Sequence, residues 1–101
     1  MELIEKDNGR TIEILSGGLV AVSLNENPTT GYRWELEKTS GLEIVSDQFQ
    51  STGDAIGADG IRVFQFRAIS VGRSELHLKN WRKWEGDSSV INRFDVTIFI
   101  K

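Results

Sequence analysis

The chain has 101 residues and a mass of 11.4 kDa, which is enough for one domain with a hydrophobic core but not for two. Its hydrophobic share of 39% and charged share of 27% are typical of a folded globular protein. A net charge of −3 argues against duplex nucleic acid or an anionic membrane as a partner, and a chain without cysteine has no disulfide bond, thiolate metal site or cysteine nucleophile. We therefore predict a single domain over residues 1–101.

The N-terminal residues 1–6 have neither the basic start nor the apolar core of a secretory signal peptide. On this basis we expect a cytoplasmic protein, or a periplasmic or secreted one if a signal peptide has been removed. No apolar run in the sequence is long enough to cross a bilayer.

Apolar and polar residues alternate along most of the chain, and turn signals separate the alternating runs. A period of two indicates strands that bury one face, and no segment has a helical period. Short strands at this spacing are typical of an all-β sandwich. In chain order, the predicted strands lie near residues 3–4, 11–15, 19–24, 32–37, 42–49, 61–69, 73–79 and 90–100.

Residues 27–32, with the sequence NPTTGY, form what we call the proline loop, which contains the only proline of the chain. Pro28 fixes its own φ and favours an extended conformation for the residue before it. Thr29 and Thr30 are β-branched and stiff, whereas Gly31 can adopt a positive φ and has no side chain to hold another molecule away. A rigid loop loses little entropy when it docks, so this stretch predicts a binding loop, with an ordinary turn as the alternative.

Two other loops have compositions suited to binding. Residues 53–60, the glycine loop, contain three glycines, and residues 81–86, the tryptophan loop, contain two tryptophans and an Arg-Lys pair. Tryptophan and arginine are frequent hot spots of protein interfaces. Because alternate connections of a sandwich emerge at the same end, we expect all three loops to lie together.

The three tryptophans have different predicted roles. Trp34 lies on an alternating strand and is expected in the core. Trp81 directly follows a strand, and the pattern leaves open whether it folds back onto the sandwich or stays exposed. Trp84 lies mid-loop among polar residues, which favours a binding role over a packing role.

With these three loops, the chain resembles the chagasin-type inhibitors of papain-like cysteine proteases. The proline loop matches the first motif of that family fully. The second motif, at residues 57–60, has Asp59 where the family has glycine, and the third has Lys83 in place of the proline of Arg-Pro-Trp. From these departures we expect a narrower or weaker inhibition profile than that of a fully matching relative.

The resemblance implies an immunoglobulin-like sandwich of about seven to eight antiparallel strands that inhibits such proteases reversibly, competitively and without a covalent bond. The proline loop would lie over the catalytic cysteine and histidine of the protease, with the tryptophan loop on one side of the cleft and the glycine loop on the other. A monomer suffices for this wedge, and no cofactor or metal is implied. The residues implied in protease binding are Asn27, Pro28, Thr29, Thr30, Gly31, Tyr32, Gly57, Ala58, Asp59, Gly60, Arg82, Lys83, Trp84 and Gly86.

Two other classes of function compete with this interpretation. An enzyme would depend on His77, the only histidine, which the alternation places on a solvated strand face with no visible nucleophile and base beside it. An adhesion or carbohydrate-binding module would use Trp81 and Trp84 to stack on a sugar ring, but it has no need of the complete NPTTGY motif.

Overall fold

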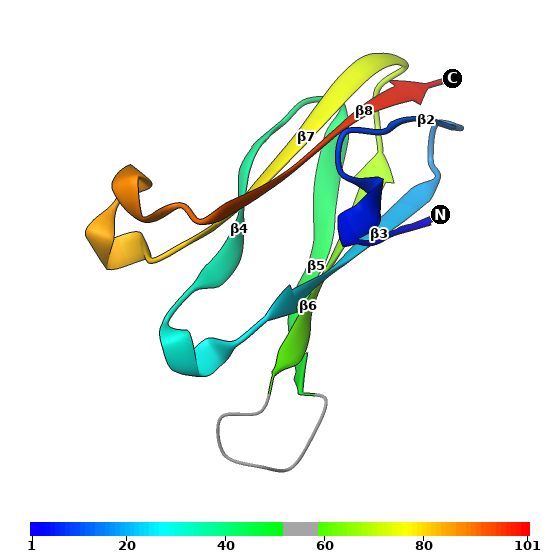
Figure 1. Cartoon of the computed structure of the whole chain (residues 1–101). Coiled ribbons are helices and arrows are strands. Elements are labelled where there is room, and N and C mark those ends of the chain that lie inside the picture. The colour runs from blue at the N-terminus through cyan, green and yellow to red at the C-terminus, as the bar shows by residue number, and fades with distance from the viewer. Residues whose placement is uncertain (52–58) are drawn as a thin grey trace.

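The computed structural model describes residues 1–51 and 59–101. The described chain folds into two four-stranded sheets that pack face to face (Figure 1). The first sheet has the strand order β1-β3-β6-β5, and the second has the order β2-β8-β7-β4. The eight strands are β1 (Glu2–Leu3), β2 (Thr11–Ile14), β3 (Leu19–Glu26), β4 (Arg33–Thr39), β5 (Leu42–Ser51), β6 (Gly60–Ala68), β7 (Gly72–Trp81) and β8 (Asn92–Ile100).

The predicted all-β sandwich is confirmed, and the four pairings between the longer strands are antiparallel. The pairings of β1 with β3 and of β2 with β8 are parallel, which differs from the all-antiparallel expectation. The chain passes from the first sheet to the second between β1 and β2, so neither strand is joined to its partner by the tight hairpin turn that imposes antiparallel pairing.

The core consists of the inward-facing residues of both sheets, as the alternation predicts. Val20, Val22 and Leu24 of β3 are at most 1% exposed, and Trp34 is 3% exposed, which confirms its predicted place in the core. Burying side chains of this size contributes about 1.5–3 kcal/mol each. The other buried hydrophobic residues are Leu3, Ile12, Leu42, Phe64, Phe66, Ala68, Leu76, Leu78, Phe94, Val96, Ile98 and Ile100.

Two local features differ from the sequence pattern. The last strand begins at Asn92, two residues after its predicted start at residue 90. A shift of register interrupts the pairing of β5 with β6, between Ile44 and Ser46 of β5. A bulge there adds one residue on β5 and leaves the alternation of β6 regular.

The two chain ends lie at the end of the sandwich opposite the proline loop (Figure 1). The N-terminal amine bonds to the carbonyl of Leu19 at the start of β3, and the Lys101 amide bonds to the carbonyl of Ile14. The proline loop leaves from the other end of β3, so the sandwich separates it from both termini.

Candidate functional site

Strand register brings the proline loop, the tryptophan loop and the β5–β6 stem of the glycine loop to one end of the sandwich (Figure 1). Glu26, the residue before the proline loop, is paired with Gly60, where the chain leaves the glycine loop. Arg33, the residue after the proline loop, is paired with Trp81, where the tryptophan loop begins. The proline loop therefore crosses from the first sheet to the second and has the stem of another predicted loop on each side.

A single 3₁₀ turn at Pro28–Thr30 gives the proline loop its shape. Asn27 caps this turn, because its Oδ1 accepts hydrogen bonds from the amide of Thr29 at 3.0 Å and from the Thr29 hydroxyl at 2.6 Å. The Thr30 hydroxyl donates to the carbonyl of Asn27 at 2.8 Å. Gly31 ends the turn with a φ of 80°, a left-handed conformation that favours glycine. The threonine hydroxyls thus stiffen the loop from within.

Arg82 connects the tryptophan loop to the proline loop. Its Nε donates to the carbonyl of Thr30 at 3.1 Å, and its guanidinium carbon lies 4.4 Å from the centre of the Tyr32 ring. A third contact joins its Nη1 to Glu85 at 3.3 Å within the tryptophan loop. The side chain is 33% exposed, so part of it remains on the surface while its Nε and the face of its guanidinium hold the two loops together.

Trp84 is 72% exposed and lies over Gly31. A Cβ atom at Gly31 would be 2.6 Å from the Cη2 atom of the Trp84 ring, closer than such contacts normally occur. The indole therefore rests on the one position of the proline loop that has no side chain, with most of its surface directed to solvent. The expectation of an exposed Trp84 is confirmed.

The second loop tryptophan packs against the protein. The Nε1 of Trp81 donates to Glu35 at 2.9 Å, and the Lys79 amine lies 3.5 Å from the centre of its ring. Lys79 is also paired with Asp87 at 3.1 Å, which ties the end of the β7–β8 connection to the same ring. The alternative that the sequence left open is resolved, because Trp81 folds back onto the second sheet. One tryptophan, Trp84, is thus left for a binding role, which weakens the proposal of a sugar-stacking pair.

A groove of about 230 Å³ lies between the proline loop and the tryptophan loop. Lys83 lies at its edge with a side chain that is 79% exposed, and its amine is 3.9 Å from Glu35. Such an exposed pair contributes little to stability, so Lys83 remains available to a partner. The lining residues are Gly31, Arg33, Glu35, Trp81, Lys83 and Trp84.

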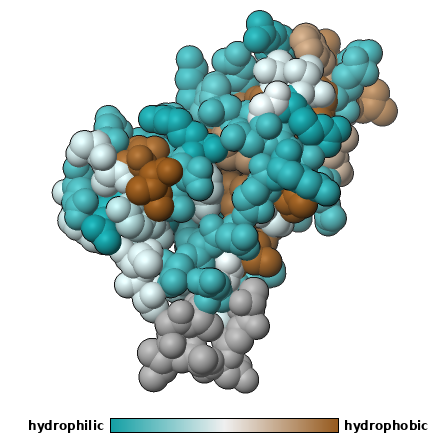
Figure 2. Space-filling model, in the orientation of Figure 1, coloured by the Kyte–Doolittle hydropathy of each residue, from teal (hydrophilic) through white to brown (hydrophobic). Residues whose placement is uncertain are grey.

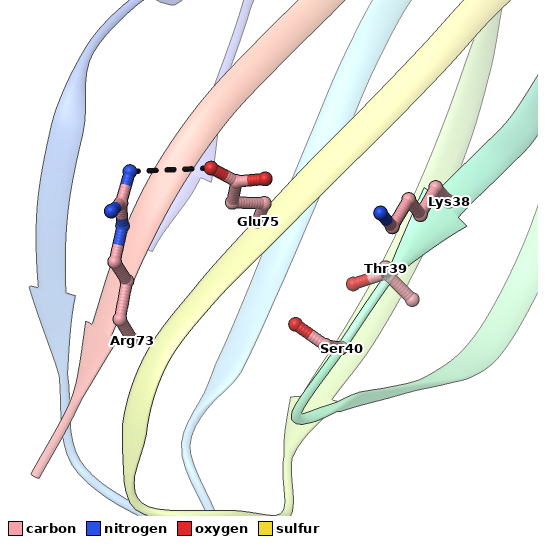
Figure 3. Close-up of a pocket in the computed structure, with 5 residues that line it drawn as sticks. All are labelled: Lys38, Thr39, Ser40, Arg73 and Glu75. Carbon is pink, nitrogen blue, oxygen red and sulfur yellow. Dashed lines mark hydrogen bonds and ion pairs between the residues drawn. The ribbon is translucent and has the colours of Figure 1, made fainter.

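The surface around these loops is mostly hydrophilic. Figure 2 shows separate hydrophobic patches in place of one continuous field, and one patch lies on the lobe that the β7–β8 connection forms. Another hollow, of about 350 Å³, lies at the other end of β4 and β7 and is bordered by the exposed ion pair of Arg73 and Glu75, 3.2 Å apart (Figure 3). Its polar lining and its distance along the strands from the predicted loops separate it from the candidate site.

Gly57 and Ala58, predicted to bind protease, lie outside the described residues. Asp59 is exposed, and Gly60 is buried where β6 begins. A Cβ atom at Gly60 would be 2.6 Å from the carbonyl oxygen of Gln50 and closer still to the ring of Phe49. Gly60 therefore has a packing reason to be glycine, apart from any contact with a protease.

The sequence model of a family described as "Chagasin family peptidase inhibitor I42" matches residues 13–98. The chain belongs to this family. It is 30% identical over 101 residues to Chagasin of Trypanosoma cruzi, an alignment that covers 93% of this chain and 90% of the relative. It is also 32% identical over 88 residues to Amoebiasin-1 of Entamoeba histolytica, covering 83% of this chain and 84% of the relative.

The fold agrees with this assignment. The crystal structure of the cysteine protease inhibitor EhICP2 from Entamoeba histolytica superposes with a TM-score of 0.90 at 25% identity, covering 99% of this chain and 94% of that one. The predicted resemblance is thereby confirmed, and the chagasin family is one of inhibitors, not of enzymes.

In this chagasin-family chain, His77 is held by two carboxylates. Its Nδ1 lies 2.7 Å from Asp95 and its Nε2 lies 3.3 Å from Glu75. The hydrogen bond to Asp95 is the main cause that raises the pKa of His77 above its usual value, against the opposing effect of burial, and Glu75 adds to it. Both ring nitrogens are engaged with acids, so the imidazole is an ion-pair partner on the strand face.

Within residues 1–51 and 59–101, no group of three or more histidine, aspartate or glutamate side chains is placed to hold a metal ion. In the same ranges, no helix has the length and apolar character that a membrane span requires.

Sequence reasoning missed a buried ion pair at the base of the site, between Glu26 and Arg62. Their closest nitrogen and oxygen atoms are 2.8 Å apart, and Glu26 is 4% exposed. The available signal was that Glu26 continues the inward-facing series Val20, Val22 and Leu24. An acid at a core position predicts a buried partner.

Proposed function

We propose that this protein inhibits papain-like cysteine proteases reversibly and competitively, by inserting its loop end into the active-site cleft without forming a covalent bond. The observation that carries the proposal is the union of the proline and tryptophan loops, through Arg82 on the Thr30 carbonyl and Trp84 on Gly31. This union makes one preorganised edge, which loses little entropy on docking. Family membership and the likeness to a cysteine protease inhibitor of known structure support it.

The tip of the proline loop can approach a buried thiolate closely. Pro28, Thr29 and Thr30 are exposed, and their side chains are small. Gly31 adds no side chain behind them. We therefore place this tip over the catalytic cysteine and histidine of the protease.

The same loop is a poor substrate, because three of its carbonyl groups are already engaged. The carbonyl of Asn27 accepts from the amide and hydroxyl of Thr30, that of Pro28 accepts from the amide of Gly31, and that of Thr30 accepts from Arg82. Hydrolysis requires a carbonyl that is aligned with the nucleophile and free to enter an oxyanion hole. A 3₁₀ turn with three bonded carbonyls is not an extended strand that aligns a carbonyl with the nucleophile, so the loop would occupy the cleft without being cleaved.

The two flanks of the wedge have different chemistry. Trp84 offers a large, mostly exposed ring that we place against an aromatic or apolar surface beside the cleft. On the other flank we place residues 57–60, where Asp59 would add a carboxylate to the contact. Tyr32 supports the wedge through Arg82, and Gly86 ends the 3₁₀ turn that carries Trp84.

The test is a titration of papain and a cathepsin L-like enzyme with the wild type and with the Thr30→Ala and Trp84→Ala variants. We expect tight competitive inhibition, weakened about 30-fold by Trp84→Ala, since hot-spot truncations cost about 2 kcal/mol or more. Thr30→Ala removes the hydroxyl that donates to Asn27 and should weaken inhibition as well.

Two control variants match these changes in chemistry and lie away from the site. Leu15→Ala truncates a hydrophobic side chain that is 73% exposed, close to the 72% of Trp84. Thr11→Ala removes an exposed threonine hydroxyl from β2. Both controls should inhibit like the wild type. A folded wild type without inhibition at micromolar concentration, or cleavage within residues 27–32 in step with inhibition, would overturn the proposal.

A further inference from the structure

On the inward-facing side of the first sheet, the residues nearest the proline loop are charged. Along β3, the buried residues Val20, Val22 and Leu24 are followed by Glu26, whose side chain is 2% exposed. Along β6, the buried series continues to Arg62, whose side chain is 12% exposed. An apolar pair would have closed this end of the core without any cost of desolvating charges.

The carboxylate of Glu26 joins the two sheets. Its Oε2 accepts from the Nε and Nη2 of Arg62 at 3.1 and 2.8 Å, a two-pronged ion pair within the first sheet. Its Oε1 accepts from the backbone amide of Trp34 at 2.7 Å, in the second sheet. Glu26 precedes the proline loop and Trp34 follows it, so this hydrogen bond connects the entry of the loop to its exit.

A second bond closes the base of the proline loop. The Nε1 of Trp34 donates to the carbonyl of Asn25 at 2.9 Å. Asn25 and Glu26 precede the loop, and Trp34 follows it, so the backbone on either side of the loop is connected twice. The amide of Asn25 also donates to Glu5, which ties this base to the N-terminal 3₁₀ turn.

Arg62 extends the connection to the strands that flank the glycine loop. Its Nη1 bonds to Asp47 of β5 at 3.1 Å, and its guanidinium carbon lies 5.5 Å from the centre of the Phe49 ring, which covers Gly60. Burial alone would lower the pKa of Arg62, but hydrogen bonds to Glu26 and Asp47 outweigh it and raise this pKa. The guanidinium is therefore a permanent cation with directed bonds on both sides.

We infer that the Glu26–Arg62 pair is a positioning device for inhibition, which sets the proline loop relative to the β5–β6 stem. This inference rests on the proposed function of the loops. Buried ion pairs are weak evidence for stability, since apolar residues of similar volume often replace them without loss. Their bonds are directional, however, and here they constrain the backbone on both sides of the loop that would occupy the cleft.

The decisive variant removes both charges and keeps the volume, Glu26→Gln with Arg62→Met. We expect its thermal midpoint to stay close to that of the wild type, because no uncompensated charge remains in the core. Its inhibition constant should nevertheless rise about tenfold, since the loop is less preorganised. If the double variant has both the thermal midpoint and the inhibition constant of the wild type, the pair does not position the loop, and the inference is overturned.

A second variant, Glu26→Asp, keeps both charges but shortens the side chain by one methylene. The carboxylate can then no longer reach Arg62 and the Trp34 amide together at their present distances, so inhibition should weaken while the core charge remains paired. Wild-type inhibition by a folded Glu26→Asp protein would contradict the inference, even if the double variant failed to fold.

A readout in the free inhibitor separates this inference from the proposed function. Amide hydrogen exchange at residues 25–34 should accelerate in both Glu26 variants, whereas the matched control, Arg73→Met with Glu75→Gln at the other end of the sandwich, should leave it unchanged. Unchanged exchange in the Glu26 variants would refute the positioning role whatever the wild type inhibits. If Trp84→Ala and Thr30→Ala leave inhibition intact, the proposed function of the proline and tryptophan loops fails instead.

Discussion

Gly31 has two independent reasons to be glycine. Its φ of 80° is a conformation that costs other residues roughly 1–2 kcal/mol, and a Cβ atom there would collide with the ring of Trp84. The conformational reason was expected from the sequence, because Gly31 can adopt a positive φ. The contact with Trp84 could not be predicted, because it joins residues from two loops whose approach depends on the register of β4 and β7.

Replacing Gly31 with alanine should weaken inhibition far more than it weakens the fold. The matched control is Gly9→Ala, because Gly9 has a φ of 85° and no atom within 4 Å of the position its Cβ would take. Both variants should lose about 1–2 kcal/mol of unfolding free energy from backbone strain. Only Gly31→Ala should also displace Trp84 and raise the inhibition constant about tenfold or more. Equal inhibition by the two variants would show that the position of Trp84 is irrelevant.

His77 should make the stability of the fold depend on pH. Its pKa is raised in the folded protein by Asp95 and then Glu75, so the protonated ring is favoured by folding. This contribution is fully present below the unfolded pKa of about 6.5, and it is lost as the pH rises through the higher folded-state pKa. We expect the urea midpoint to fall over that interval in the wild type, and to fall less in His77→Gln. If the urea midpoint of His77→Gln falls with pH as steeply as that of the wild type, another group causes the pH dependence.

At the scale of elements, the alternation predicted most of the strands but not the connections between them. The series Val20, Val22 and Leu24 identifies a half-buried strand with no reference to the rest of the chain. Residues 90 and 91 show the limit, since the pattern favoured a strand there, whereas β8 begins only at Asn92, after the 3₁₀ turn at Asp87–Ser89. Arg62, the partner of Glu26, lies 36 residues further along the chain, and a local sequence pattern cannot identify a partner so far away in the sequence.

The tryptophan loop should accept a proline at residue 83. Lys83 is the first residue of a 3₁₀ turn, and Arg82 before it is extended, with φ −100° and ψ 108°. Proline favours both conditions, so Lys83→Pro should raise the unfolding free energy by about 0.4–1 kcal/mol, through the entropy of the unfolded chain. It should also strengthen inhibition of several papain-like enzymes, because the loop that carries Trp84 becomes stiffer.

The two departures from the family motifs can be tested separately with inhibition constants for each enzyme. Asp59→Gly restores the second motif, and its effect should differ between enzymes, since a carboxylate matters only where the protease offers a charge nearby. No change with either variant across the enzyme panel would refute the prediction that Asp59 and Lys83 narrow or weaken the inhibition profile.

At the scale of the whole molecule, family, fold class and the proximity of the proline and tryptophan loops could all be predicted from the sequence. The strength of that prediction lies in one six-residue motif together with two partial ones in the right order. The base of the site could not be predicted, because Glu26, Trp34 and Arg62 come from three strands in two sheets. Alternation identifies which face a residue occupies, but it does not say which residues meet there.

One domain should suffice for one protease. The wedge uses loops of a single chain, so we expect a particle of 11.4 kDa alone and a complex with one inhibitor per enzyme. Light scattering of the free protein and calorimetric titration of a protease that is inactive because its catalytic cysteine is replaced by alanine, and whose cleft stays open, would measure both quantities. A free dimer, or a ratio of two inhibitors per enzyme, would mean that a second copy contributes to the contact.

The placement of the termini has a practical consequence. Both ends of the chain lie across the sandwich from the proline loop (Figure 1). A polypeptide or a solid support attached at either end would extend away from a captured protease. Immobilised through either terminus, the protein should therefore deplete its target enzymes from solution, and a fluorescent domain fused at either end should report their location without competing for the cleft.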